Sequence, residues 1–263
     1  MTPAQFYTKR YSKILPFFAI ICIFDFIMSP SISALYEVLA DFTLAFGLLS
    51  NPNISVVGVG WFLGTVFVFY MLFPFICFLI RNKISAWLAF AVTIFYQIAC
   101  NNYFEQSKGR TNFIYSSMFF MAGCLIYLYK DELVCIVNWF RWIVLSLVIL
   151  ITICYFITPE KALSVNNIWM LVIFSSFLIY AMGVDSKILY NSVIKFIAGI
   201  SMEIYLCHMV IFRVIEKLHL NYLFGKGVVS YAITCIMVLV GTIVFSIIIN
   251  FGINVVRKKL IKE

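Results

Sequence analysis

Charged residues are scarce in this 263-residue chain. Only 11% of its residues are Asp, Glu, Lys or Arg, against roughly 25% in soluble domains. It has only two histidines, and its eight cysteines form no CxxC pair and no Cys/His ligand spacing. Residues 1–13 lack the apolar core and cleavage site of a secretory signal. The low charge excludes a water-soluble globule, and the spacing of the cysteines and histidines gives no sign of a metal site. Without a signal peptide, membrane insertion must depend on the first apolar segment.

Apolar residues make up 64% of the chain. They gather in stretches that approach the roughly 20 residues needed to cross a bilayer core. Stretches such as VIFSSFLIYAMG are apolar on all sides, unlike the alternating strands of a barrel. We therefore predict an all-α, polytopic membrane protein with one domain over residues 1–263, its cysteines acting as small buried hydrophobes. The eight predicted spans cover residues 14–29, 59–80, 84–100, 113–129, 139–158, 167–184, 193–213 and 228–256.

A ninth candidate span, residues 33–49, carries Glu37 and Asp41 and could instead lie at the membrane interface. With eight spans and the N-terminus inside, 13 Lys and Arg residues fall inside and 6 outside; a crossing at 33–49 would give 9 inside and 10 outside. The positive-inside rule thus favours eight spans and two cytoplasmic termini. We expect the protein in the plasma (inner) membrane. Topology also explains the net charge of +8 better than nucleic-acid binding does.

Ionisable groups inside spans are costly, by about 2.5 to 3.5 kcal/mol at mid-helix, and need a partner or a purpose. Four such groups stand out: Asp25, Glu203, His208 and Arg213. Ser201, Tyr205 and His208 follow i, i+4, i+7 spacing, which places them on one helix face. Glu203 is expected to point elsewhere, toward a neighbouring helix. His208 can act as a base near neutral pH; the alternative is that these groups only join helices by hydrogen bonds.

A second cluster lies in FYTKRYSKILP, at the cytoplasmic mouth of the first span. Arg10 and Lys13 are three residues apart, so a helix would place both cations on one face. There they could hold the phosphates of a cytoplasmic ligand, Arg by its planar fork and Lys as a point charge. The alternative is topology anchoring by anionic lipid headgroups.

A third cluster lies in GWFLGTVFVFYMLFPFI. Trp61 is expected near the outer interface and Tyr70 near the middle of the span, with Pro74 beyond it. Gly60 and Gly64 are spaced for close helix approach. An aromatic belt with a small-residue contact would also explain this pattern.

Four segments occur in a recognisable order: FYTKRYSKILP, WFLGTVFVFYMLFP, TNFIYSSMFFMAGCLIYLYK and GISMEIYLCHMVIF. In this order the chain resembles the acyltransferase 3 family of bacterial integral membrane proteins. The resemblance implies transfer of an acyl group, commonly acetyl, from cytoplasmic acyl-CoA to a sugar hydroxyl of a surface or exported polysaccharide. Acyl-CoA would be a co-substrate, with no bound cofactor and no metal.

The resemblance also implies roles for individual residues. Arg10 and Lys13 would bind the coenzyme, and His208 would bind the acceptor or serve as an auxiliary base. The residues expected to bind substrate are Trp61, Tyr70, Ser201, Glu203 and Tyr205. The expected partners are acyl-CoA, a glycan or glycolipid acceptor and membrane lipids, with no nucleic acid.

The sequence departs from the family pattern in two places. Family members usually begin with two further helices, the first carrying an Arg and the principal catalytic His, and this sequence resembles the family from the third helix onward. Val66 and Val68 replace an acidic residue and a Gln, and Lys13 stands where a second Arg is common. We therefore expect a chain incomplete at its N-terminus, as from a late start codon or truncated gene, that transfers acyl groups poorly or not at all. The alternative is a non-enzymatic multipass protein, either a transporter subunit or a scaffold.

Overall fold

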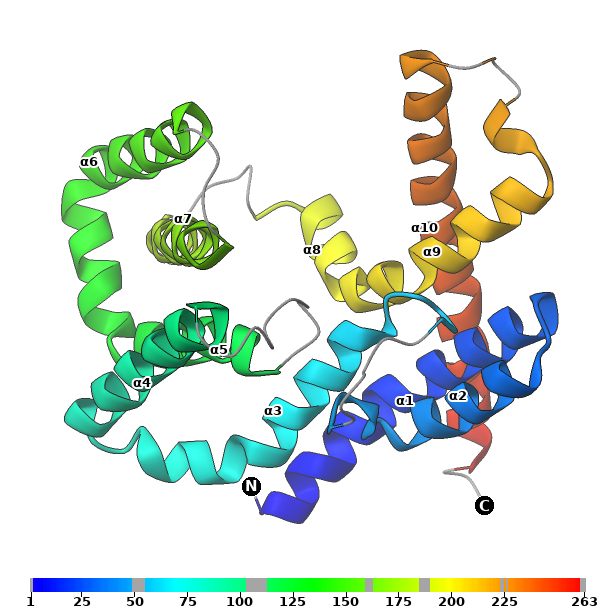
Figure 1. The fold of residues 1–263 in the computed structure, drawn as a ribbon, viewed down its shortest axis with the longest axis horizontal. Helices are drawn as coiled ribbons and strands as arrows, with labels where there is room; N and C mark the ends of the chain where they lie inside the picture. The colour runs from blue at the N-terminus through cyan, green and yellow to red at the C-terminus, as the bar shows by residue number, and fades with distance from the viewer. Residues whose placement is uncertain are drawn as a thin grey trace. The chain divides into compact units, whose positions relative to one another are not determined.

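The computed structural model describes residues 2–48, 55–102, 113–158, 163–184, 190–222, 225 and 227–260. Within these ranges the chain is helical and has no strand, which confirms the all-α prediction. Figure 1 labels the helices in chain order. Their bounds are α1 (Pro3–Met28), α2 (Ile32–Thr43), η1 (Phe46–Leu48), α3 (Gly60–Leu79), α4 (Lys83–Asn102), α5 (Phe113–Leu128), α6 (Lys130–Ile157), α7 (Leu163–Gly183), α8 (Ser192–Gly199), α9 (Ser201–Lys217), η2 (Leu220–Tyr222) and α10 (Val228–Leu260).

The described helices are those of a polytopic membrane protein. Five of them, α1, α3, α6, α7 and α10, are long and apolar enough to cross a membrane. The bent pair of α8 and α9 adds a sixth candidate, and the described parts of α4 and α5 are shorter apolar helices. Large apolar side chains such as Trp139, Phe156 and Phe251 are exposed on the outer faces of their helices, where lipid would surround them. Each predicted span overlaps described helix, and the number of crossings stays a prediction.

Two predicted spans differ in detail from the helices. The segment 193–213 is not continuous, because α8 and α9 meet at a bend of 66° around Ile200. Gly199 favours the break, and the Ser201 hydroxyl donates to the Ala198 carbonyl at 3.0 Å across it. The segment 139–158 is the second part of a longer α6, which is kinked at Phe140. The charge count also used residues outside the described ranges: Lys108, Arg110, Lys161, Lys187, Lys226 and Lys262.

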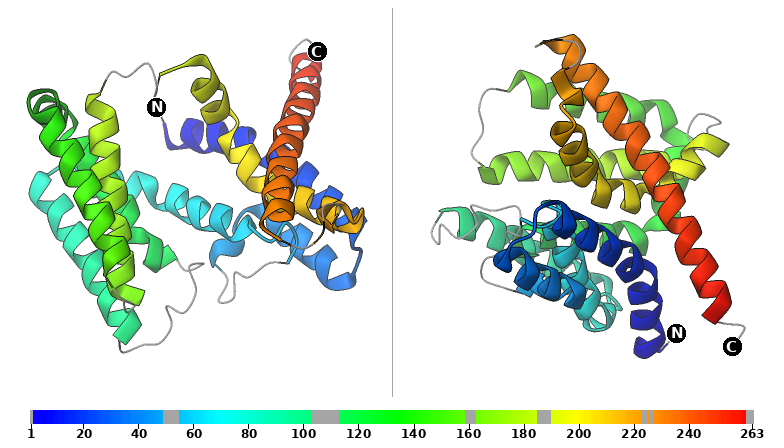
Figure 2. Two further views of the ribbon diagram at one scale, coloured as in Figure 1. Left: turned by 90° about the horizontal axis from the view of Figure 1, so that it is seen from above. Right: turned by 90° about the vertical axis from the view of Figure 1, so that its right-hand side faces the viewer.

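The chain divides into two compact units, which are described separately. Unit 1 comprises Met1–Tyr70 and Lys195–Glu263, and unit 2 comprises Met71–Ile194. In unit 1, α1 packs against α2 and α9, and α9 packs against α10; these pairs can be followed in Figure 2.

Helix α1 begins at a capping box, in which Thr2 and Gln5 satisfy each other's backbone N–H groups. Its buried side chains recur at helical spacing, and Ile14, Phe18 and Ile21 belong to the core of unit 1. The short η1 packs on α3 through a glycine contact, because a Cβ on Gly64 would lie 2.5 Å from the Phe46 ring. The predicted close approach at Gly64 therefore exists, with η1 as the partner.

In unit 2, α6 pairs with α7 and α4 pairs with α5. The Tyr155 hydroxyl donates to Asn166 Oδ1 at 2.8 Å between α6 and α7. At the start of α4, Lys83 forms an exposed ion pair of 3.0 Å with Glu132.

The prediction that the cysteines are buried is only partly correct. Cys22 and Cys207 are buried, whereas Cys135, Cys154 and Cys235 are exposed on their helices. A membrane span is apolar on its outer face as well, so an apolar sequence context does not distinguish a core position from a lipid-facing one. Every cysteine whose side chain the structure describes is a free thiol.

Candidate functional site

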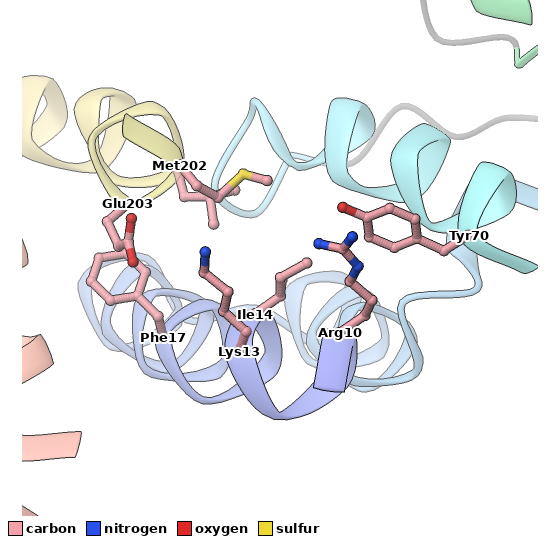
Figure 3. Close-up of a pocket in the computed structure, with 8 residues that line it drawn as sticks. Arg10, Lys13, Ile14, Phe17, Tyr70, Met202 and Glu203 are labelled. Carbon is pink, nitrogen blue, oxygen red and sulfur yellow. The ribbon is translucent and has the colours of Figure 1, made fainter. Parts of the chain in front are cut away.

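Side chains from three helices of unit 1 meet at a small pocket, which we call the basic pocket (Figure 3). Its volume is about 70 Å³. It is lined by Arg10, Lys13, Ile14 and Phe17 from α1, Tyr70 from α3, and Met202, Glu203 and Leu206 from α9. Four residues that the sequence singled out, from three separate segments, are therefore neighbours here: Arg10, Lys13, Tyr70 and Glu203.

The helical repeat of α1 explains why both cations face this pocket. Arg10, Lys13, Ile14 and Phe17 are separated by three or four residues, so they lie on one face of the helix. Two of them, Ile14 and Phe17, are buried and fix this face against the core of unit 1. The cations are exposed, and Figure 3 shows Arg10 directed toward the Tyr70 ring.

Aromatic rings hold Arg10 in place. Its Cζ lies 5.0 Å from the centroid of the Tyr70 ring and 5.4 Å from that of Phe6, within the range of cation–π attraction. The rings of Phe6 and Tyr70 meet edge to face at 5.9 Å. These cation–π contacts do not use the N–H groups as hydrogen-bond donors to oxygen, so the groups can donate to a ligand.

Within the described part of the chain, Arg10 and Lys13 make no ion pair and donate no hydrogen bond. Glu203 lines the same pocket but is not paired with either cation. It does face a neighbouring helix, α1, as the sequence predicts. The pocket therefore offers two unpaired cations on one side and a carboxylate on the other.

His208 does not lie at the basic pocket. It lines a separate, largely apolar groove of about 440 Å³ between α9 and α10, together with Tyr231 and Thr234. Its Nδ1 lies 2.6 Å from the Tyr205 carbonyl, so in the neutral ring Nδ1 carries the proton and Nε2 has the free lone pair. The sequence placed His208 and Glu203 on different faces of this helix, but it could not tell which face meets α1 and which meets α10.

The remaining predicted residues make packing contacts. Tyr205 packs against Phe62 at 5.0 Å and against His208 at 5.7 Å. Trp61 lies beside Phe62, and neither ring lines the basic pocket. The Ser201 hydroxyl is engaged with the Ala198 carbonyl at the bend between α8 and α9.

Asp25 and Arg213, flagged as charges within spans, form an ion pair. Arg213 Nη1 donates to Asp25 Oδ2 at 2.5 Å, and Arg213 Nη2 donates to the Ser55 carbonyl at 2.9 Å. The two charged residues are separated by 188 positions in the chain. In the sequence, the only sign of this ion pair is that two opposite charges lie within apolar segments. That sign does not tell which residue pairs with which.

Comparison with known proteins gave one finding. A family model described as an acyltransferase domain matches residues 2–250, nearly the whole chain. No curated protein and no solved structure matches the chain.

Proposed function

The chain belongs to the acyltransferase 3 family, and from this premise we propose that it transfers an acyl group, acetyl in its usual reaction, from acyl-CoA to a sugar hydroxyl of a surface or exported polysaccharide. The observation that carries the proposal is the unpaired pair of cations, Arg10 and Lys13, held on one face of α1. Together they provide a planar fork and a point charge, which suit the phosphates of coenzyme A.

The reaction makes three demands on the protein. The sugar oxygen attacks the thioester carbonyl, a C–O bond forms, the C–S bond breaks, and the hydroxyl proton passes through a base to the departing thiolate. A base must take the proton, cations must hold the coenzyme, and donors must stabilise the oxyanion. Arg10 and Lys13 meet the second demand. His208, with its free Nε2, is proposed as an auxiliary base or an acceptor contact.

Charge determines how the coenzyme would lie in the basic pocket. Glu203 repels phosphate, so the phosphates are expected beside Arg10 and Lys13, with an uncharged part of the donor facing Glu203. Tyr70 supports this arrangement by fixing the Arg10 guanidinium. We further propose that the protein lies in the plasma membrane with this pocket on the cytoplasmic side, where acyl-CoA is made.

The test is acyl-CoA binding by the chain in lipid nanodiscs. Arg10→Gln and Lys13→Gln should each weaken binding of radiolabelled acetyl-CoA by about tenfold, since each removes a charge-assisted hydrogen bond to phosphate. Lys9→Gln is the matched control, because Lys9 precedes Arg10 on α1 and does not line the pocket. It should leave the affinity unchanged.

Transfer itself is followed in membranes as movement of labelled acetyl from acetyl-CoA to glycolipid. Equal affinity of Arg10→Gln, Lys13→Gln, Lys9→Gln and the natural chain would reassign Arg10 and Lys13 to topology anchoring. No acetyl-CoA binding at all would instead favour the alternative of a transporter subunit or scaffold.

A further inference from the structure

Three consecutive cations lie in the last turn of α10, and we call them the basic end: Arg257, Lys258 and Lys259. All three are exposed, and the sequence of α10 contains no acidic residue. Within the described part of the chain, none of the three forms an ion pair. The C-terminus of a helix carries only about half a negative charge, so the basic end keeps an excess of positive charge that can attract an anion.

A hydrogen bond to α1 fixes the position of the basic end. Arg257 Nη2 donates to the Ser12 carbonyl at 2.7 Å. Pro16 lies inside α1, four residues after Ser12. Because proline has no backbone N–H, the Ser12 carbonyl lacks its usual partner within the helix, and Arg257 satisfies it from α10. The basic end is therefore held against the first half of α1.

The face of α10 that meets the core of unit 1 leads to Arg257. Phe245, Ile249 and Ile253 pack against this core. They recur every four residues, and Arg257 continues the same row. The contact with Ser12 is thus the last one on the core-facing side of the helix.

A second row on α10 leads to the two lysines. The side chains of this outer row are apolar and exposed: Val244, Ile248, Phe251 and Val255. Lys258 and Lys259 follow Val255 by three and four residues, so both continue the outer row. One face of α10 therefore presents an exposed apolar strip that ends in two cations.

An anionic phospholipid matches this face in charge and in polarity. Helix α10 is long and apolar enough to cross a membrane, which places its outer row against lipid chains and its basic end at the level of the headgroups. Groups of Lys and Arg at the end of a span attract anionic lipids. A soluble phosphate compound would match the two cations but would leave the apolar strip without a partner.

We propose that the outer row and the basic end of α10 form a binding site for one anionic phospholipid. The ammonium groups of Lys258 and Lys259 donate to the headgroup phosphate, and an acyl chain packs along Phe251 and Val255. In the predicted topology this lipid belongs to the cytoplasmic leaflet. The site is separate from the basic pocket, which none of these residues lines, and it does not depend on acyl transfer.

Photolabelling of the full chain in phosphatidylcholine nanodiscs tests this proposal. Two probes, a phosphatidylglycerol and a phosphatidylcholine, carry the same diazirine-bearing acyl chain and are added in equal trace amounts. Mass spectrometry then locates the labelled residues. The phosphatidylglycerol probe should label residues 244–255 about tenfold more than the phosphatidylcholine probe does, because each lysine near the headgroups favours the anionic lipid.

Paired substitutions separate this site from a general attraction of anionic lipid to the protein. Lys258→Gln combined with Lys259→Gln should lower labelling by the phosphatidylglycerol probe to the phosphatidylcholine level. Replacing both lysines by Arg should preserve it. The matched control is Arg81→Gln combined with Lys130→Gln, which removes two exposed cations beside α3 and α6 and should leave labelling of α10 unchanged. Labelling by the phosphatidylcholine probe should be the same in every chain, which shows that α10 stays in place.

Several outcomes would overturn the proposal. Equal labelling of α10 by both probes would do so, as would an equal loss in the two Gln pairs. An excess of acetyl-CoA distinguishes a lipid from a soluble phosphate compound: unchanged labelling supports the lipid site, whereas displacement of the probe assigns Lys258 and Lys259 to the coenzyme. A chain that binds the phosphatidylglycerol probe as expected but does not bind acetyl-CoA contradicts only the proposed function.

Discussion

Asp41, near the end of α2, shows how one carboxylate can make unit 1 sensitive to pH. The residue is 0% exposed, and its Oδ1 has no hydrogen-bond partner among the described residues. Burial raises the pKa of Asp41 from 3.8 to about 7, and the negative charge of Glu37 adds to the effect. The weak hydrogen bond from Cys22 Sγ, at 3.6 Å, acts in the opposite direction. Near neutral pH, Asp41 is therefore close to its titration midpoint.

We predict that the protein becomes less stable as the pH rises from 4 to 7. In this window the folded chain retains the Asp41 proton, which the unfolded chain loses near its pKa of 3.8. The contribution of protonated Asp41 to the free energy of unfolding is therefore fully present below the unfolded pKa. It is lost as the pH rises through the folded pKa. Asp41→Asn should flatten this part of the profile. Thermal unfolding in detergent at several pH values measures it, with Asp131→Asn, an exposed position on α6, as the control. An identical slope in both variants would contradict the assignment.

At the scale of helices, the sequence predicted contacts between residues close together in the chain and missed those between distant ones. Arg10 and Lys13 share a face because of the helical repeat alone, so their common site was predictable. The pairing of Asp25 with Arg213 was not, because it joins residues 188 positions apart. The bend after Gly199 was also missed, since an apolar run reads as one span whether or not its helix breaks.

The contact between η1 and α3 gives a prediction at this scale. Gly64→Ala should destabilise unit 1 by about 1 to 3 kcal/mol, because the new methyl group overlaps the buried Phe46 ring. Gly123→Ala on α5 is the control, since a Cβ there meets nothing within 4 Å. It should be neutral or slightly stabilising. Chemical unfolding of both variants in detergent measures the difference, and equal midpoints would show that the Gly64 contact is loose.

At the scale of the whole chain, unit 1 is assembled from the first 70 residues and the last 69. Both the basic pocket and a second cavity, lined in part by Asp25, Ser31, Ser55 and Arg213, combine residues from these two stretches. Helix α9 contributes Glu203 to the first and Arg213 to the second. Arg257, near the end of α10, donates to the Ser12 carbonyl of α1. The start of α1 and the end of α10 are thus neighbours, which favours two termini on one side of the membrane.

The length of α2 and the position of its flanking residues predict that it does not cross the membrane. Its 12 residues extend about 18 Å, well short of the roughly 30 Å hydrocarbon core. Ser31, at its start, and Ser55, beyond its end, line one cavity. A crossing helix would instead place them on opposite faces of the bilayer.

Cysteine labelling tests this topology in intact cells, against a background in which Cys135, Cys154 and Cys235 are replaced by Ala. Ser33→Cys and Ser55→Cys should both react with an impermeant maleimide from outside. Asn82→Cys should react only after permeabilisation, because α3, a candidate span, is expected to cross between residues 55 and 82. Labelling of residues 33 and 55 from opposite sides would show that α2 crosses. Labelling of residues 33 and 55 only from the cytoplasm would still mean that α2 does not cross, but the protein would have the opposite orientation in the membrane. The basic pocket would then lie on the outer side, away from the supply of acyl-CoA.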